Sequence, residues 1–143
     1  MIRAVLDTNV LVSALLHLEG SPSSQIFELF LRKEFLLLTS KPILTEVERL
    51  IHEDRIVDRY SLSEKRRQAF IISVHRLSRP VPIRMPISGV VEDSDDNKFL
   101  ACAMKGKADF VVSGDRHLLD LDHFHKIKIV TPKTFLVLLQ RPN

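Results

Sequence analysis

Acidic side chains recur in this sequence at places where α/β proteins commonly carry out chemistry. Asp7 directly follows one apolar run, and Asp115 comes just after another. Glu46 lies in the first half of an expected helix, and Asp96 lies at the start of a later one. Carboxylates gathered at one place raise each other's pKa values, and a divalent cation relieves the repulsion. Mg²⁺ and Mn²⁺ prefer such oxygen ligands and activate water for attack on a phosphodiester.

Each acid taken alone also has a purely structural explanation. Asp7 suits a helix cap, Glu46 suits a solvated helix position, and Asp115 suits a turn after Gly114. The acids near position 95 suit a helical first turn, where the helix dipole favours negative charge; they are Asp93, Asp95 and Asp96. Considered as a set of acids at strand ends and helix starts, they favour a functional site, although spacing alone leaves their convergence open.

Apolar periodicity predicts the elements that must position these acids. We expect strands over 2–6, 35–38, 110–113 and 127–130. We expect helices over 9–18, 23–32, 41–51, 96–104, 116–120 and 133–140, and another that follows a cap at Ser61 and runs to about 77. A turn or short helix is expected over 52–60. This alternation predicts a three-layer α/β/α sandwich with a central, mostly parallel sheet. Functional sites in such folds lie beyond the carboxyl ends of the strands.

Several residues predict where these elements begin and end. Thr8 is expected to cap the first helix, and Ser61 with Glu64 forms a capping-box pattern. Gly106 suits the residue that follows a helix end. Three prolines exclude a regular helix or a central strand near position 82, namely Pro80, Pro82 and Pro86.

Length and composition predict one domain, 1–143, of a globular protein. The chain has 143 residues, 45% of them hydrophobic and 27% charged. Its formal net charge is +3, a mild basic bias that permits a nucleic-acid partner. The single cysteine, Cys102, excludes an internal disulfide, disfavours a cysteine-based zinc site and is expected in the core. No signal peptide or membrane span is predicted, so a cytoplasmic location without membrane association is expected.

Four short motifs, in order along nearly the whole chain, resemble those of the PIN-domain family. They are the VLDTNVLVSA run at 5–14, ILTEV at 43–47, DSDDNKFLACA at 93–103 and VSGD at 112–115. The final IVTP at 129–132, followed by a helix, is also similar to this family. The most similar subgroup is that of the bacterial and archaeal proteins described as toxin components of toxin–antitoxin pairs.

The resemblance implies a metal-dependent endoribonuclease with Mg²⁺ or Mn²⁺ as cofactor. It places the catalytic and metal-binding acids at Asp7, Glu46, Asp96 and Asp115. Water would attack the phosphorus in line and leave a 5′-phosphate product. Asp93 is a further candidate metal ligand, although Ser94 stands where the subgroup commonly has proline.

Other residues complete the expected site. Asn9 and Ser113 match positions that orient the acids or a metal-bound water. Lys98 and Arg116 lie close in sequence to the acids and are candidates for contacts with substrate phosphates, with surface salt bridges as the alternative. The basic residues between 65 and 79 suit either a solvated helix face or a phosphate-contacting rim. The histidines of the late segment are expected at the surface, and they are His117, His123 and His125.

The resemblance further implies RNA as substrate, a homodimer and an antitoxin protein as partner. Two alternative functions stay open. One is a catalytically inactive PIN-fold module that binds RNA or protein, although all four matched acids are present. The other is a Mg²⁺-dependent phosphatase of the haloacid dehalogenase type, which Asn9 disfavours because those enzymes carry a second aspartate there.

Overall fold

The structure is a computed structural model, and it describes residues 1–16, 20–83 and 94–141, without the side chains of 94–96. In these residues six strands form one sheet in the order β3-β2-β1-β4-β6-β5. Only β5 runs antiparallel to its neighbour β6, and the other pairings are parallel. The strands are β1 (Arg3–Leu6), β2 (Leu36–Thr39), β3 (Arg79–Pro80), β4 (Phe110–Val112), β5 (His123–Phe124) and β6 (Ile127–Val130).

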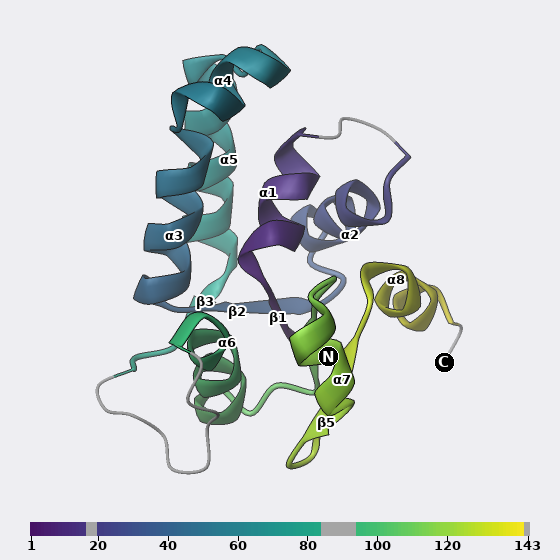
Figure 1. Ribbon diagram of the computed structural model, residues 1–143. Helices are drawn as coiled ribbons and strands as arrows, with labels where there is room; N and C mark the ends of the chain where they lie inside the picture. Colours follow the sequence, from purple (N-terminus) through teal and green to yellow (C-terminus); the bar gives the residue numbers. More distant parts are fainter. Residues whose placement is uncertain (17–19, 84–93, 142–143) are drawn as a thin grey trace.

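Helices connect the strands and flank the sheet (Figure 1). They are α1 (Thr8–Leu16), α2 (Pro22–Leu31), α3 (Lys41–Ile51), α4 (Asp54–Tyr60), α5 (Glu64–Leu77), α6 (Ser94–Lys105), α7 (Arg116–Leu121) and α8 (Pro132–Gln140). The predicted α/β class with a mostly parallel sheet between helices is therefore confirmed. The segment expected as a turn or short helix forms α4. The first helix is described only to Leu16, since residues 17–19 lie outside the described part of the chain.

The order of the strands reverses direction beside β1. The chain moves outward from β1 through β2 to β3, and then crosses back to β4 and on to β6. Because parallel crossovers are right-handed, this reversal places α6 on the opposite face of the sheet from α1 and α2, as Figure 1 shows. The gap between β1 and β4 is thus a topological switch point, where open α/β sheets bind their ligands.

Continuous apolar sequence in the central strands reflects burial on both faces of the sheet. In β1, Ala4 and Val5 are completely buried, and in β4 so are Val111 and Val112. Phe135 of α8 packs edge-on against Phe35 and Phe110, which joins the last helix to the core. These buried central strands lead at their carboxyl ends to Asp7 after β1 and Asp115 after β4.

Two short strands were not predicted. Pro80 lies in β3 at the edge of the sheet, where the missing proline amide costs no ladder bond, and the Val81 amide donates to the Thr39 carbonyl at 2.7 Å. β5 pairs His123 with Lys128 of β6 in a tight hairpin. Strands of two residues show no periodicity, so only their pairing with a neighbour defines them.

The predicted capping box before α5 is wrong. Ser61 instead ends α4 in a left-handed conformation, with φ of 49°. Ser63 caps α5, and its hydroxyl oxygen accepts from the Arg66 amide at 3.1 Å. The separate helix α4 shifts the start of α5 by two positions, and the serine spacing in the sequence does not distinguish the two candidates.

The predicted role of Gly106 at the end of α6 is also wrong. Lys107 adopts the left-handed conformation there, with φ of 57°. A β-carbon on Gly106 would lie 2.8 Å from Leu38 Cδ1 and 2.9 Å from Val81 Cγ2. Gly106 is therefore required by close packing of the helix end on β2 and the segment after β3.

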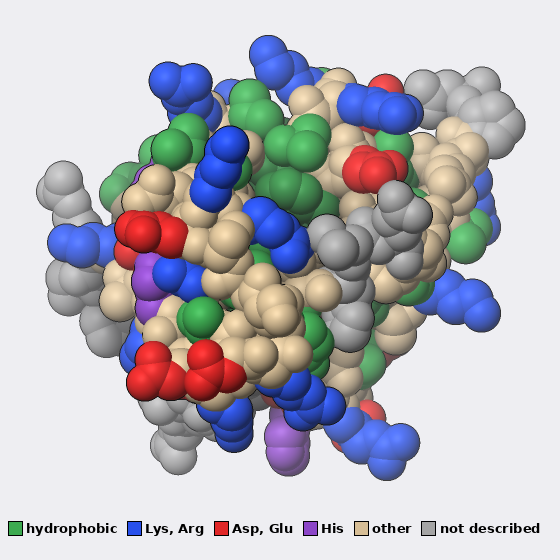
Figure 2. Space-filling view, turned by 90° about the horizontal axis from the view of Figure 1, so that it is seen from above, with side chains coloured by type: hydrophobic (Ala, Val, Ile, Leu, Met, Phe, Trp, Pro, Cys, Tyr) green, Lys and Arg blue, Asp and Glu red, His purple; other side chains and the backbone are tan. Residues whose placement is uncertain are grey.

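Charged side chains are mixed on the end of the molecule where α4 and α5 lie (Figure 2). Two arginines of the basic run on α5 bind backbone: Arg66 donates to the Leu15 carbonyl at 2.8 Å and Arg67 to the Leu62 carbonyl at 2.7 Å. Part of this run thus stabilises helix contacts. Within the described residues no helix has the length and apolar character needed to cross a membrane.

Replacement of Gly106 by alanine should destabilise the fold. The added methyl group overlaps buried Leu38 and Val81, and overpacking of this kind costs about 1–3 kcal/mol. Gly114→Ala is the matched control, because a β-carbon there has no neighbour within 4 Å. Urea denaturation of both variants measures the difference, and equal free energies of unfolding would contradict the packing argument.

Candidate functional site

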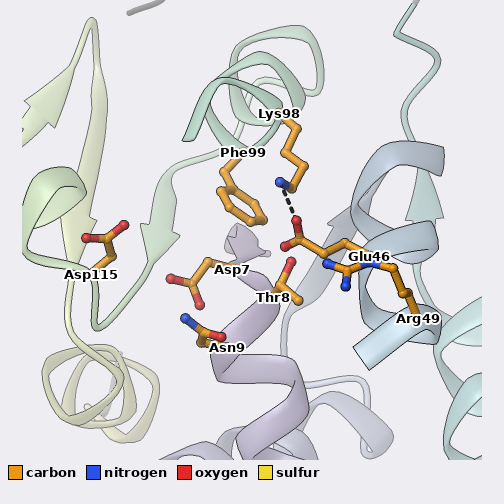
Figure 3. Close-up of a pocket in the computed structure, with 8 residues that line it drawn as sticks. All are labelled: Asp7, Thr8, Asn9, Glu46, Arg49, Lys98, Phe99 and Asp115. Atoms are coloured by element: carbon orange, nitrogen blue, oxygen red, sulfur yellow. Dashed lines mark ion pairs between the residues drawn. The ribbon is translucent and has the colours of Figure 1, made fainter. Parts of the chain in front are cut away.

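A cavity of about 300 Å³ lies at the carboxyl ends of the central strands (Figure 3). Three of the predicted acids line it: Asp7 after β1, Glu46 on α3 and Asp115 after β4. Five other residues complete the wall, namely Thr8, Asn9, Arg49, Lys98 and Phe99. Residues more than 100 positions apart in the sequence thus meet where β1, β2 and β4 end side by side.

Asp7 is buried, with 3% of its surface exposed. Its Oδ1 accepts from the Val10 amide at 2.8 Å, so Asp7 caps α1 and the predicted cap at Thr8 is wrong. Its Oδ2 accepts from the Ser113 hydroxyl. Burial raises the pKa of Asp7 and outweighs these two hydrogen bonds, which lower it. The negative charges of Asp115 and Glu46 raise the pKa further.

Ser113 connects the ends of β1 and β4. Its side chain is completely buried and donates to Asp7, while its oxygen accepts from the Asp115 amide at 2.9 Å. Asp115 in turn caps α7, because its Oδ1 accepts from the His117 amide at 3.0 Å. Ser113 therefore orients the Asp7 carboxylate directly and also fixes the backbone of Asp115.

Glu46 is paired with a cation. Its Oε2 lies 2.7 Å from Lys98 Nζ, and the two side chains are 26% and 14% exposed. Partial burial raises the pKa of Glu46, but the Lys98 hydrogen bond and the charges of Lys98 and Arg49 outweigh it and hold that pKa below its usual value. Glu46 is thus held ionised on the wall opposite Asp115 (Figure 3).

Two predicted acids have side chains that the structure does not describe. Asp96 lies in the first turn of α6, the helix that also brings Lys98 and Phe99 to the cavity. Asp93 lies outside the described residues. The assignment of both as metal ligands stays a prediction.

The donor atoms of the cavity fit a hard divalent cation. Asp7, Glu46 and Asp115 supply carboxylates, and Thr8 and Asn9 add a hydroxyl and an amide oxygen. These are the ligand types of Mg²⁺ and Mn²⁺. The described side chains include no cluster of three or more acidic, histidine or cysteine residues that would hold a metal by itself. Such a cation would therefore need water, substrate or the acids at the start of α6 as further ligands.

Sequence reasoning missed some lining residues and placed others elsewhere. Arg49 was not singled out, although it follows Glu46 by three positions on one helix face. Arg116 is the exposed first residue of α7 and is not among the residues that line the cavity.

Cys102 is buried in the core, and burial raises the pKa of its thiol to about 12. The surface position expected for the late histidines is observed at His117, His123 and His125.

A sequence model of the PIN domain matches residues 3–117 of this chain, which is most of its length. The chain belongs to the PIN-domain family. The match spans β1 through the start of α7, and therefore every element that contributes to the cavity. PIN domains are generally nucleases and typically depend on divalent metals.

Two similar proteins extend the comparison. The uncharacterized protein MJ1680 of Methanocaldococcus jannaschii is 29% identical over 143 aligned residues, which cover 94% of this chain and 90% of the relative. The crystal structure of VapBC2 from Rickettsia felis, bound to a DNA fragment from its promoter, matches with a TM-score of 0.58. That alignment covers 91% of this chain and 98% of the other at 13% identity, and it shows a shared fold.

Asp7→Asn should stabilise the metal-free PIN domain increasingly as the pH rises. The folded chain holds the Asp7 proton more tightly than the unfolded chain does, because the pKa of Asp7 is raised by folding. Wild-type Asp7 therefore adds to the free energy of unfolding at low pH, and this contribution is lost as the pH rises above 3.8. Asparagine stays neutral and still caps α1. Denaturation in EDTA at about pH 5 and about pH 8 measures the effect.

The exposed Asp58 of α4 provides the control for that experiment. Asp58→Asn should change stability little at either pH. A stability difference between wild type and Asp7→Asn that stayed constant or shrank with rising pH would contradict the proposed burial of charge at Asp7.

Proposed function

We propose that this PIN domain is a metal-dependent endoribonuclease, with Mg²⁺ or Mn²⁺ as cofactor. The observation that carries the proposal is the convergence of Asp7, Glu46 and Asp115 on one cavity at the switch point of the sheet. A phosphodiester requires both an activated water and neutralisation of developing charge, and a carboxylate site with a divalent cation supplies both.

We assign metal binding to Asp7, Asp115 and Asp96, with Glu46 nearby and Asp93 as a further candidate. When bound, the cation would lower the pKa of water and stabilise charge at the phosphorus. Ser113 keeps the Asp7 carboxylate in one orientation by its hydrogen bond. Asn9 lies at the cavity wall, where its amide can position water or substrate.

Cations beside the acids provide contacts for the substrate backbone. Lys98 lies at the cavity, and its pairing with Glu46 keeps a positive charge within the acidic site. Arg116 follows Asp115 directly and is exposed, so it can meet a phosphate at the α7 side. Phosphate contacts of this kind position a nucleic acid without reading its sequence.

We further propose that the protein is the toxin of a toxin–antitoxin pair, acting as a homodimer in the cytoplasm and held inactive by an antitoxin. The motifs resemble those of that subgroup of PIN domains, and the VapBC2 structure of Rickettsia felis has a similar fold. Co-expression with a protein encoded by an adjacent small reading frame tests this part: growth arrest that the neighbour relieves is the expected result.

Cleavage of RNA should depend on the acids of the site. Purified protein with Mn²⁺ should cut a single-stranded RNA, leaving 5′-phosphate ends. Asp7→Asn and Asp96→Asn should each lower the rate by at least about 100-fold, because each removes a charge-stabilising group from the reacting centre. Gel analysis of end-labelled RNA measures this, and Asp58→Asn is the control that should retain full activity.

The same purified proteins distinguish a ribonuclease from the two alternative functions, a phosphatase and a non-catalytic binding module. A phosphatase would hydrolyse p-nitrophenyl phosphate and leave the RNA intact. A non-catalytic binding module would bind RNA without cleaving it and show no Mn²⁺ binding heat that Asp7→Asn abolishes. Unchanged cleavage by folded Asp7→Asn protein would overturn the assignment of the site.

A further inference from the structure

Two cationic side chains among the described residues line the acidic cavity, and they differ in accessibility. Lys98 is 14% exposed, and its Nζ lies 2.7 Å from Glu46, so its charge is directed at the cavity wall. Arg49 is 63% exposed and reaches solvent at the mouth of the cavity. Of these two, Arg49 is the one that an anion outside the cavity would meet.

The position of Arg49 places its charge to one side of the acids. It follows Glu46 by three residues on α3, so both side chains lie on the same side of that helix. Figure 3 shows Arg49 on the Glu46 side of the cavity, across from Asp115. A nucleic-acid strand that ran along the cavity from Asp115 past Asp7 would bring a neighbouring phosphate toward Arg49.

Glu53 holds Arg49 in the absence of a ligand. Arg49 Nη1 lies 3.1 Å from Glu53 Oε1, and Glu53 occupies the turn where α3 ends and α4 begins. The same carboxylate lies 3.6 Å from Arg55 Nη2. Ion pairs this exposed contribute little to stability, so Arg49 can exchange Glu53 for another anion at small cost.

The charge around the cavity makes such an exchange useful to an RNA-binding site. Asp7, Glu46 and Asp115 repel a polyanionic backbone, and the whole chain carries a net charge of only +3. Figure 2 shows basic side chains spread among acidic ones on the face it displays. A guanidinium at the cavity mouth offsets the local repulsion, and its planar fork matches a phosphate.

We propose that Arg49 binds the RNA phosphate next to the scissile one, on the α3 side, and that Glu53 holds its guanidinium until RNA replaces the carboxylate. This proposal rests on the ribonuclease function proposed above. Arg49 is a substrate-positioning residue here, whereas the acids remain the reacting groups.

The first test compares Arg49→Ala with Arg55→Ala. Both variants remove one arginine and one partner of Glu53, but Arg55 is 81% exposed on α4 and does not line the cavity. Binding of a labelled single-stranded RNA is measured in the Asp7→Asn background at fixed Mn²⁺ and increasing NaCl. Arg49→Ala should lower the affinity about fivefold at 0.1 M salt and reduce the salt slope by about 0.7, the value for one phosphate contact.

Arg55→Ala should leave both the RNA affinity and the salt slope close to those of the Asp7→Asn reference protein. Arg49→Lys keeps the charge and should restore the slope with part of the affinity. In the active protein, Arg49→Ala should raise KM with little change in kcat, because it removes a binding contact away from the reacting atoms. Thermal melts of each variant check that the fold is retained.

The second test concerns Glu53. Glu53→Gln should tighten RNA binding about two- to fivefold, because the exposed ion pair no longer competes with the phosphate. In the Arg49→Ala background the same substitution should have no effect, and this pair of variants isolates the coupling between the two residues.

The outcomes separate this proposal from the function on which it rests. If wild-type protein neither binds nor cleaves RNA, the ribonuclease proposal fails and the Arg49 assignment fails with it. If wild type cleaves RNA and Arg49→Ala behaves like Arg55→Ala, only the Arg49 assignment is overturned. If Glu53→Gln also tightened RNA binding in the Arg49→Ala background, the proposed role of Glu53 in holding Arg49 would be contradicted.

Discussion

The placement of a carboxylate inside the core, at the end of the central strand, constrains the rest of this structure. Asp7 extends β1 by one residue, and its amide donates to the Val112 carbonyl at 3.0 Å. Its carboxylate is satisfied by the Ser113 hydroxyl and the Val10 amide. Burial of a charge is unfavourable even with such partners, and neighbouring acids add to that cost. The cation proposed for this site would offset that cost.

The parallel sheet explains why the other acids gather around Asp7. The strands β2, β1 and β4 are adjacent and point the same way, so the segments that follow them leave from one edge. Glu46 enters that edge from α3 and Asp115 from the turn before α7. The Lys98–Glu46 pair then links α6 to α3 across the cavity. Lys98 therefore brings positive charge into the acidic cavity through its pairing with Glu46, and Arg49 adds an exposed guanidinium to the cavity lining.

The errors in the sequence analysis have a common physical origin. Apolar runs located the four longer strands, because burial of the central sheet leaves a continuous signal. Helix caps were misplaced where two candidates stood close together, as at Thr8 beside Asp7 and Ser61 beside Ser63. The close approach at Gly106 depends on Leu38 and Val81, which are distant in sequence. Caps and close contacts are decided by neighbours in space, which periodicity does not report.

The sequence alone determined the α/β architecture, the family and the identity of the candidate acids, because these follow from apolar runs and short motifs within a few residues. Tertiary structure decided which side chains meet. Only the order of strands brings Asp7, Glu46 and Asp115 to one cavity, and only the packing of α6 against α3 pairs Glu46 with Lys98. Arg49 lines the cavity for the same reason. Its chemistry is plain in the sequence, but its position at the cavity results from where α3 lies on the sheet.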